Sequence, residues 1–227
     1  EDIDKYSSFA KTRYLAHCLD QAPLYAGQHI TYEKFGNSTY RSREMGEAFD
    51  VLEKTMLLQR VTGTTSRSLP ILSNRKKAPK LLFLDAGLVN YRMGIQDRFF
   101  QKKDLQDYYW GKIYEQIVGQ QLISLQDEAP QPVHYWYRDK PGSTAEVDFL
   151  LLQNGECIPI EVKAGQSGHL RSLAQLMKSS ASQWAIRMYT GHLQEESIQN
   201  DRSTFHLLSV PFFLLPRLRD WKSLILQ

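Results

Sequence analysis

The chain has 227 residues, of which 42% are hydrophobic and 23% are charged, and this globular composition excludes wholesale disorder. The length suits two domains of about 100 residues each. Cys18 and Cys157 lie too far apart in sequence to indicate a disulfide scaffold, and no apolar run approaches the ~20 residues that cross a bilayer. Since there is no signal peptide either, we expect a cytoplasmic protein without membrane contact. A first residue other than Met leads us to expect part of a longer protein.

The net charge of +3 is distributed unevenly. The segment from Lys54 to Leu84 contains seven basic residues and no Asp or Glu. A basic segment in an otherwise mildly acidic chain indicates a polyanionic partner, and we expect nucleic acid, DNA in particular. The alternative is a solvated loop that happens to be rich in lysine and arginine. The residues expected to contact phosphates are Arg67, Arg75, Lys76 and Lys77.

Residues 1–95 are predicted to form a winged-helix-like domain. Apolar residues recur every three or four positions over 3–20 and again from about 42, which predicts two helices with a short element at 31–35 between them. Strands are expected at 57–62 and 80–84, on either side of the basic loop 63–78. In a winged helix the longer helix can enter a DNA major groove while the hairpin loop contacts phosphates. The alternative is a module that serves only protein interaction or packing.

Residues 96–227 are predicted to form a second domain of the α/β class with a central mixed sheet. The segment 85–107 is interpreted as the boundary. A helix is expected over 108–125 and strands over 133–138, 145–152 and 157–163. A helix over 170–180, a strand over 184–189 and a β-like segment over 205–210 follow.

Asn154 and Gly155 separate two β-rich runs and predict a tight hairpin, because a type I′ turn needs two residues with positive φ. A two-residue loop places Asp148 opposite Glu161. Strand alternation then puts four polar side chains on one face and four apolar ones on the other. The polar set is Glu146, Asp148, Glu161 and Lys163, and the apolar set is Val147, Phe149, Ile160 and Val162.

Two carboxylates opposite each other on a sheet repel, with Cβ atoms roughly 5 Å apart. A divalent cation site would favour this pairing, because Mg²⁺ or Mn²⁺ is held by carboxylates, water and substrate phosphate. Lys163 could then stabilise the phosphate charge or help to activate water. The alternative is a surface hairpin in which Glu146 pairs with Lys163 and Asp148 is solvated.

These motifs resemble the PD-(D/E)XK nuclease superfamily, and more closely an uncharacterised domain at the C-terminus of bacterial and archaeal AAA-type ATPases. The stretches that carry the resemblance are LFLDAGL (82–88), GKIYE (111–115), YWYR (135–138), EVDF (146–149) and IEVK (160–163). Val147 stands where the superfamily motif has proline. The resemblance implies a restriction-endonuclease-like core preceded by a winged-helix-like region. It also implies Asp148 and Glu161 as metal ligands, Lys163 as the catalytic lysine and Glu115 as a helix-borne acidic residue.

The chain contains no G-x-x-x-x-G-K-[ST] motif, so it has no ATP site of the P-loop type, and we expect an ATPase module N-terminal to it. The expected function is metal-dependent hydrolysis of nucleic-acid phosphodiesters. One alternative is a non-catalytic DNA- or partner-binding module of an ATPase that keeps the nuclease fold. Another is a winged-helix regulator with a structural C-terminal domain.

Overall fold

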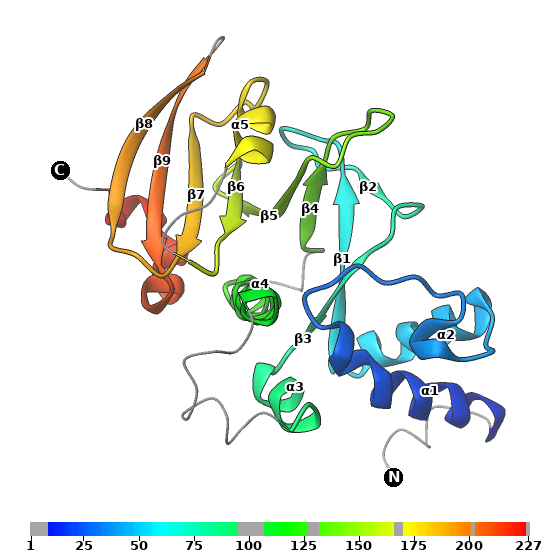
Figure 1. The fold of residues 1–227 in the computed structure, drawn as a ribbon. Helices are drawn as coiled ribbons and strands as arrows, with labels where there is room; N and C mark the ends of the chain where they lie inside the picture. The colour runs from blue at the N-terminus through cyan, green and yellow to red at the C-terminus, as the bar shows by residue number, and fades with distance from the viewer. Residues whose placement is uncertain (1–8, 95–106, 127–131, 166–169, 201–202, 226–227) are drawn as a thin grey trace.

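A mixed β-sheet with helices on both faces forms the centre of the computed structural model, which describes residues 9–94, 107–126, 132–165, 170–200 and 203–225 (Figure 1). The α/β class and the mixed sheet predicted from the sequence are confirmed. The helices are α1 (Phe9–Gln21), α2 (Ser42–Lys54), α3 (Ala86–Arg92), α4 (Asp107–Ser124) and α5 (Arg171–Met177), with 3₁₀ segments η2 (Ala22–Tyr25), η3 (Phe35–Asn37) and η4 (Phe212–Leu224). The strands are β1 (Leu58–Thr64), β2 (Ser73–Asn74), β3 (Lys80–Phe83), β4 (His134–Tyr137), β5 (Glu146–Gln153), β6 (Glu156–Val162), β7 (Trp184–Tyr189), β8 (Gln194–Asn200) and β9 (Ser203–Pro211).

The nine described strands run in the order β2-β1-β4-β5-β6-β7-β9-β8, and β3 pairs with β1 beside this path. The pairs β1–β4, β6–β7 and β7–β9 are parallel, and the other pairs are antiparallel. The strands expected to form a winged-helix hairpin, β1 and β3, do pair with each other. Because β1 also pairs with β4, the sheet crosses the domain boundary predicted near residue 95.

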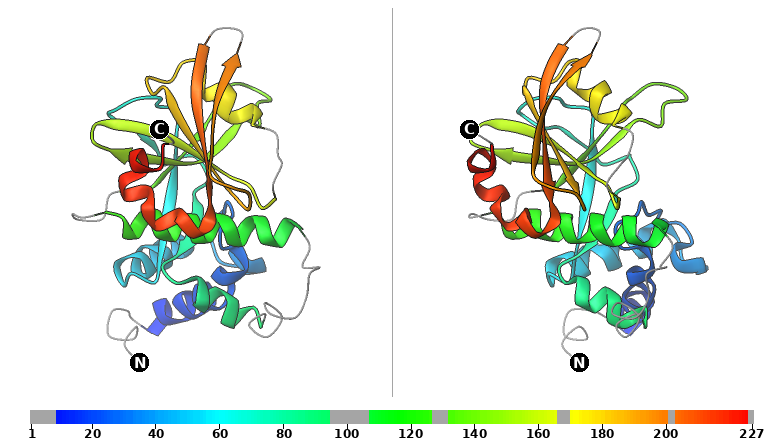
Figure 2. Two further views of the ribbon diagram at one scale, coloured as in Figure 1. Left: turned by 90° about the vertical axis from the view of Figure 1, so that its left-hand side faces the viewer. Right: turned by 60° about the vertical axis from the view of Figure 1, so that its left-hand side comes forward.

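Three apolar clusters hold the layers together. One lies between a face of the sheet and α4 with η4, where the rings of Tyr114 and Phe212 stack at 4.2 Å (Figure 2). A second lies on the other face under α5. The third packs α1, α2 and α3 against β1 and β3. No helix in the described part of the chain has the length and apolarity needed to cross a membrane.

The helix α2 follows its sequence pattern closely. Glu44 accepts a hydrogen bond from the Arg41 N–H at 2.8 Å, which satisfies one of the free donors at the helix start. Of the stripe predicted from the sequence, Met45, Ala48, Phe49 and Leu52 are buried. The prediction is wrong for its last member, Met56, which lies beyond the end of the helix and is 63% exposed. The helix also carries Asp50 and Glu53, and both pair with Arg60 of β1.

The hairpin β5–β6 has the predicted turn. Asn154 and Gly155 have φ angles of 51° and 77°, and the register runs from Gln153↔Glu156 to Phe149↔Ile160. Both observations confirm the two-residue turn predicted from the sequence. The ladder ends one step before the predicted pair of Asp148 and Glu161.

The predicted division of this hairpin into a polar and an apolar face is wrong at Val147, because β5 contains a bulge. Against β4, the register passes from His134↔Leu150 to Trp136↔Val147, so three steps on β5 match two on β4. An extra residue in a strand breaks the alternation of its side chains. Val147 therefore packs with Trp136 under α5, whereas Phe149, Ile160 and Val162 pack on the α4 side.

Candidate functional site

Lys80, the first residue of β3, is the centre of the candidate site. Only 4% of its side chain is exposed, and its ammonium lies 3.0 Å from Glu115 Oε2, 2.9 Å from Glu146 Oε1 and 3.2 Å from Asp148 Oδ1. Burial lowers the pKa of Lys80, but the three carboxylates outweigh it and hold the pKa well above its usual value. Lys80 is therefore a permanent cation inside the protein.

The helix α4 brings Glu115 to Lys80 because glutamine side chains bind it to the backbone at the end of β3 and just beyond. Buried Gln116 accepts a hydrogen bond from the Phe83 N–H at 2.9 Å and donates to the Phe83 carbonyl at 2.6 Å. Gln120 accepts from the Ala86 N–H at 2.8 Å. These contacts satisfy peptide groups that would otherwise be unpaired, and they fix the rotation of α4 about its axis.

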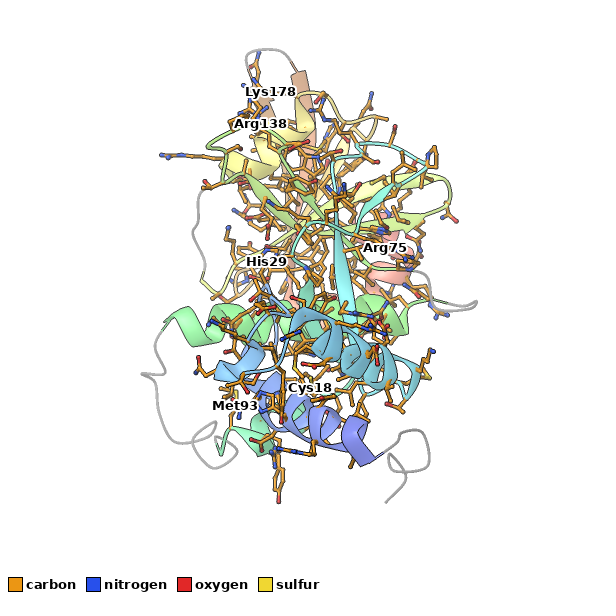
Figure 3. The ribbon with its side chains drawn as sticks, turned by 90° about the vertical axis from the view of Figure 1, so that its right-hand side faces the viewer. Cys18, His29, Arg75, Met93, Arg138 and Lys178 are labelled. Atoms are coloured by element: carbon orange, nitrogen blue, oxygen red, sulfur yellow. The ribbon has the colours of Figure 1, made fainter. Side chains whose placement is uncertain are left out.

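The segment after η2 contributes His29, which lies between the N-terminal helices and the sheet in Figure 3. This segment pairs with β3 through the bridge His29↔Lys80. The His29 Nδ1 lies 3.1 Å from the Ala78 carbonyl and its Nε2 lies 2.9 Å from Glu146 Oε2. Since both nitrogens face acceptors, the imidazolium form can donate both hydrogen bonds. Burial raises the pKa of Glu146, but His29 and Lys80 outweigh it and lower the pKa.

Glu161 of β6 and Lys163, directly after this strand, form a second group. Ile160 and Val162 pack on the α4 side, so Glu161 between them faces the α5 side of the sheet. Lys163 Nζ donates to Glu161 Oε1 at 2.6 Å, whereas the buried Glu161 Oε2 has no hydrogen-bond donor within the described residues. An unpaired buried carboxylate oxygen is costly, so this oxygen is available to a further donor or cation.

The two groups meet where the β5–β6 ladder ends. Asp148 Oδ2 accepts a hydrogen bond from the Val162 N–H at 2.9 Å, directly beside Glu161 in the chain. Burial raises the pKa of Glu161 to about 8, and the charge of Asp148 adds to this effect. The prediction that Asp148 and Glu161 pair directly on one face of the hairpin is therefore wrong, because the ladder ends at Phe149 and Ile160. Asp148 turns toward Lys80 because of the bulge, yet its charge still acts on Glu161.

Carboxyl groups outnumber ammonium groups in this cluster. The four carboxylates of Glu115, Glu146, Asp148 and Glu161 face the two ammoniums of Lys80 and Lys163. Burial raises the pKa of Glu115 to about 7, and the charge of Asp148 raises it further against the opposing effect of Lys80. The cluster therefore takes up protons near neutral pH, and it would also favour another cation.

Sequence reasoning did not identify Lys80, His29 or Arg187 as parts of this site. Arg187 on β7 is the cross-strand neighbour of Glu161, and its guanidinium lies 3.4 Å from Glu196. The one sequence feature that pointed to a buried lysine was the position of Lys80 directly before the apolar residues 81–84. Its carboxylate partners lie 35 to 68 positions later in sequence, so the pattern gave no indication of them.

Three of the four basic residues predicted to contact phosphates line two different pockets. Arg67 lines a pocket beside α5, whereas Arg75 and Lys77 line another pocket together with Arg60. The Lys76 N–H donates to Asn74 Oδ1 in the turn after β2. Of the seven basic residues in this stretch, Arg60 and Lys80 are each neutralised by carboxylates.

The described residues contain no group of three or more His, Cys, Asp and Glu side chains arranged to hold a metal ion. The Lys80 ammonium lies where three of the carboxylates could otherwise share a cation.

Two families match successive parts of the chain. The family described as Domain of unknown function (DUF8612) matches residues 1–98, and the family described as Domain of unknown function (DUF4143) matches residues 110–213. The second match contains Glu115, Asp148, Glu161 and Lys163, and the first contains Lys80 and His29. No curated protein matches the chain. The candidate site thus combines residues from both matched ranges.

Proposed function

We propose that the chain is a metal-dependent hydrolase of nucleic-acid phosphodiesters. The excess of carboxylates over ammoniums around Asp148 and Glu161 carries this proposal. Asp148 and Glu161 would hold Mg²⁺ or Mn²⁺, whose oxygen ligands are of this kind. The ion would neutralise charge that develops on the phosphoryl group. Lys163 would assist the attacking water or the transition state, and Glu115 would position a second water or ion.

The residues fit such an ion at Glu161, because its Oε2 is buried without a donor in the described residues. Asp148 fits as well, since each oxygen of a carboxylate has two lone pairs and each accepts one hydrogen bond here. Lys80 would stay in place and neutralise the carboxylates that the ion does not contact.

The resemblance to the PD-(D/E)XK superfamily supports the finer structural assignments, which are also proposals. We infer a restriction-endonuclease-like core and a winged-helix-like region over residues 1–95. An ATPase module N-terminal to the chain, a DNA partner and a cytoplasmic location follow from the same resemblance and from the composition. The sheet order and the position of α4 across one face agree with such a core (Figure 2).

A non-catalytic DNA- or partner-binding module is the second candidate, and the position of Lys80 favours it. A buried ammonium that contacts three carboxylates can replace a metal ion as a structural counter-charge. In that case the cluster would stabilise the contact between the N-terminal region and the sheet and would have no catalytic role.

Cleavage assays on the chain as it stands separate the two candidates. Single- and double-stranded DNA and RNA are incubated with the protein in Mg²⁺, in Mn²⁺ and with a chelator. We expect divalent-dependent cleavage that Asp148→Ala abolishes. Lys163→Ala should lose rate while it keeps its Mn²⁺ affinity in calorimetry, which distinguishes the lysine from the ligands.

Lys222→Ala is the matched control, because Lys222 forms the same kind of lysine–glutamate contact with Glu156 at an exposed position, at 2.9 Å. It should cleave like the wild type. The absence of cleavage in all substrates, together with no Mn²⁺ binding by the folded protein, would refute the hydrolase and support the non-catalytic module.

A further inference from the structure

A pocket of about 560 Å³ lies between the loop after β1, the end of β4 and α5, apart from the Lys80 cluster. Four of its lining residues are cationic, namely Arg67, Arg138, Lys140 and Lys178, and one is acidic, Asp139. Figure 3 shows Arg138 and Lys178 near each other at the same end of the molecule. Three separate chain segments thus bring positive charge to one concave surface.

Most of this charge is not neutralised by the protein. Within the described residues, no carboxylate forms an ion pair with Arg67, Arg138 or Lys140. The other basic pocket differs, because its Arg60 is bound by Asp50 and Glu53. A net positive pocket with unpaired guanidinium groups suits a phosphate, which guanidinium recognises through paired hydrogen bonds.

Trp136 lies in the wall of the same pocket, and only 1% of its surface is exposed. Its buried Nε1 forms no hydrogen bond in the part of the chain that the structure describes. The indole N–H signal can therefore report on changes in the pocket wall.

The pocket adjoins the candidate site on the α5 side. Tyr137 in its wall pairs with Glu146, and Trp136 pairs with Val147 at the start of β5. Trp136 packs under α5, and Glu161 with Lys163 faces the same layer. The pocket and the candidate site therefore share the strand pair β4–β5.

We propose that this pocket binds a backbone phosphate of a nucleic acid. The inference rests on the proposed function for the identity of its partner, but it does not depend on catalysis. Arg67, Arg138 and Lys140, which have no ion-pair partner among the described residues, supply the charge, and Lys178 lies beside them in the lining.

Binding of a fluorescent oligonucleotide, measured by anisotropy with a chelator present and over a range of salt concentrations, tests the proposal. The variant pair is Arg138→Ala with Lys140→Ala. The matched control is Arg217→Ala with Lys222→Ala on η4, which removes the same charge outside the pocket. We expect the pocket variant to bind at least tenfold more weakly at ~0.1 M salt. The slope of the logarithm of its binding constant against the logarithm of salt concentration should fall in magnitude by about two, because each phosphate contact contributes about 0.9. The control should match the wild type.

The Trp136 indole N–H signal in a ¹H–¹⁵N spectrum gives a second measurement, assigned from its absence in Trp136→Phe. It should shift when the oligonucleotide saturates the protein. An unchanged affinity and slope in the pocket variant, no oligonucleotide binding at all, or a shift with inorganic phosphate but not with oligonucleotide would each overturn the proposal. Cleavage with an unchanged pocket variant would refute the pocket alone, and pocket-dependent binding without cleavage would refute the hydrolase alone.

Discussion

Lys80 Nζ lies 3.2 Å from Asp148 Oδ1, although the two residues are 68 positions apart in sequence. One belongs to β3, beside the N-terminal helices, and the other to β5 in the centre of the sheet. Their contact joins the two matched parts of the chain through a buried ion pair. It also makes the carboxylate proposed as a metal ligand part of the protein's internal charge balance.

Replacing Lys80 by methionine should destabilise the protein strongly. The variant removes the buried cation and leaves Glu115, Glu146 and Asp148 together without it. Removing one partner of a buried ion pair costs about 3–5 kcal/mol, and we expect a loss of this size in the free energy of unfolding. Urea unfolding at neutral pH measures it. Lys76→Met in the exposed turn is the control and should change stability by less than about 0.5 kcal/mol. A similarly small effect at Lys80 would contradict the ion cluster.

Asp148→Ala and Asp148→Asn should differ in stability. If Asp148 and Glu161 only repelled each other, removing one carboxylate would stabilise the protein. Asp148, however, accepts hydrogen bonds from both Lys80 and the Val162 N–H. Both variants should therefore lose stability rather than gain it. The amide oxygen of asparagine can still accept from Val162, so alanine should cost about 1–3 kcal/mol more, the cost of an unpaired buried N–H. Chemical denaturation of the two variants checks this, and equal losses would show that the Val162 bond contributes nothing.

Stability should fall as pH rises from about 5 to about 8 in the absence of metal. The pKa of Glu161 is raised to about 8 by burial and that of Glu115 to about 7 by burial, so the folded state holds protons that the unfolded state has released. By linkage, the free energy of unfolding then decreases through this window. Glu161→Gln should flatten the dependence, because it removes one of the two titrating groups. Glu156→Gln, exposed on the same strand, should leave it unchanged, and a wild-type stability that rises over this range would exclude the assigned shifts.

Two glycines of α4 offer a test of how this helix packs on β3. A Cβ on Gly119 would lie 2.3 Å from Leu82 Cδ1, whereas a Cβ on Gly111 would meet nothing within 4 Å. Gly119→Ala should therefore cost about 1–3 kcal/mol through overpacking. Gly111→Ala should be neutral or stabilise by up to about 1 kcal/mol through helix propensity. Thermal unfolding of both variants measures these changes in stability. If Gly119→Ala left stability unchanged, α4 would not be packed against Leu82.

The sequence predicted the elements whose signals are local. The stripe of α2, the turn at Asn154 and Gly155 and the register from Phe149 to Gln153 all follow from neighbouring residues. The strand β8 was not predicted because QEESIQN contains one strongly β-forming residue, Ile198. A polar strand of this kind suits the edge of a sheet, where charged side chains discourage further pairing.

The site could be predicted only in part. Glu115, Asp148, Glu161 and Lys163 were identified, and the structure brings all of them near one end of the β5–β6 pair. The bulge in β5 depends on pairing with β4, so the hairpin alone could not reveal it. The roles of Lys80 and His29 depend on a bridge between the segment after η2 and β3, which no local pattern specifies.

Anomalous diffraction from a crystal soaked in Mn²⁺ tests the central claim most directly. We expect a peak contacted at about 2.1 Å by carboxylate oxygens of Asp148 and Glu161, with Lys80 still bound to Glu146. The peak should disappear in Glu161→Gln. A well-ordered site without a peak, in which Lys80 remains the cation of the cluster, would contradict the metal-dependent hydrolase and leave the non-catalytic module as the function of this chain.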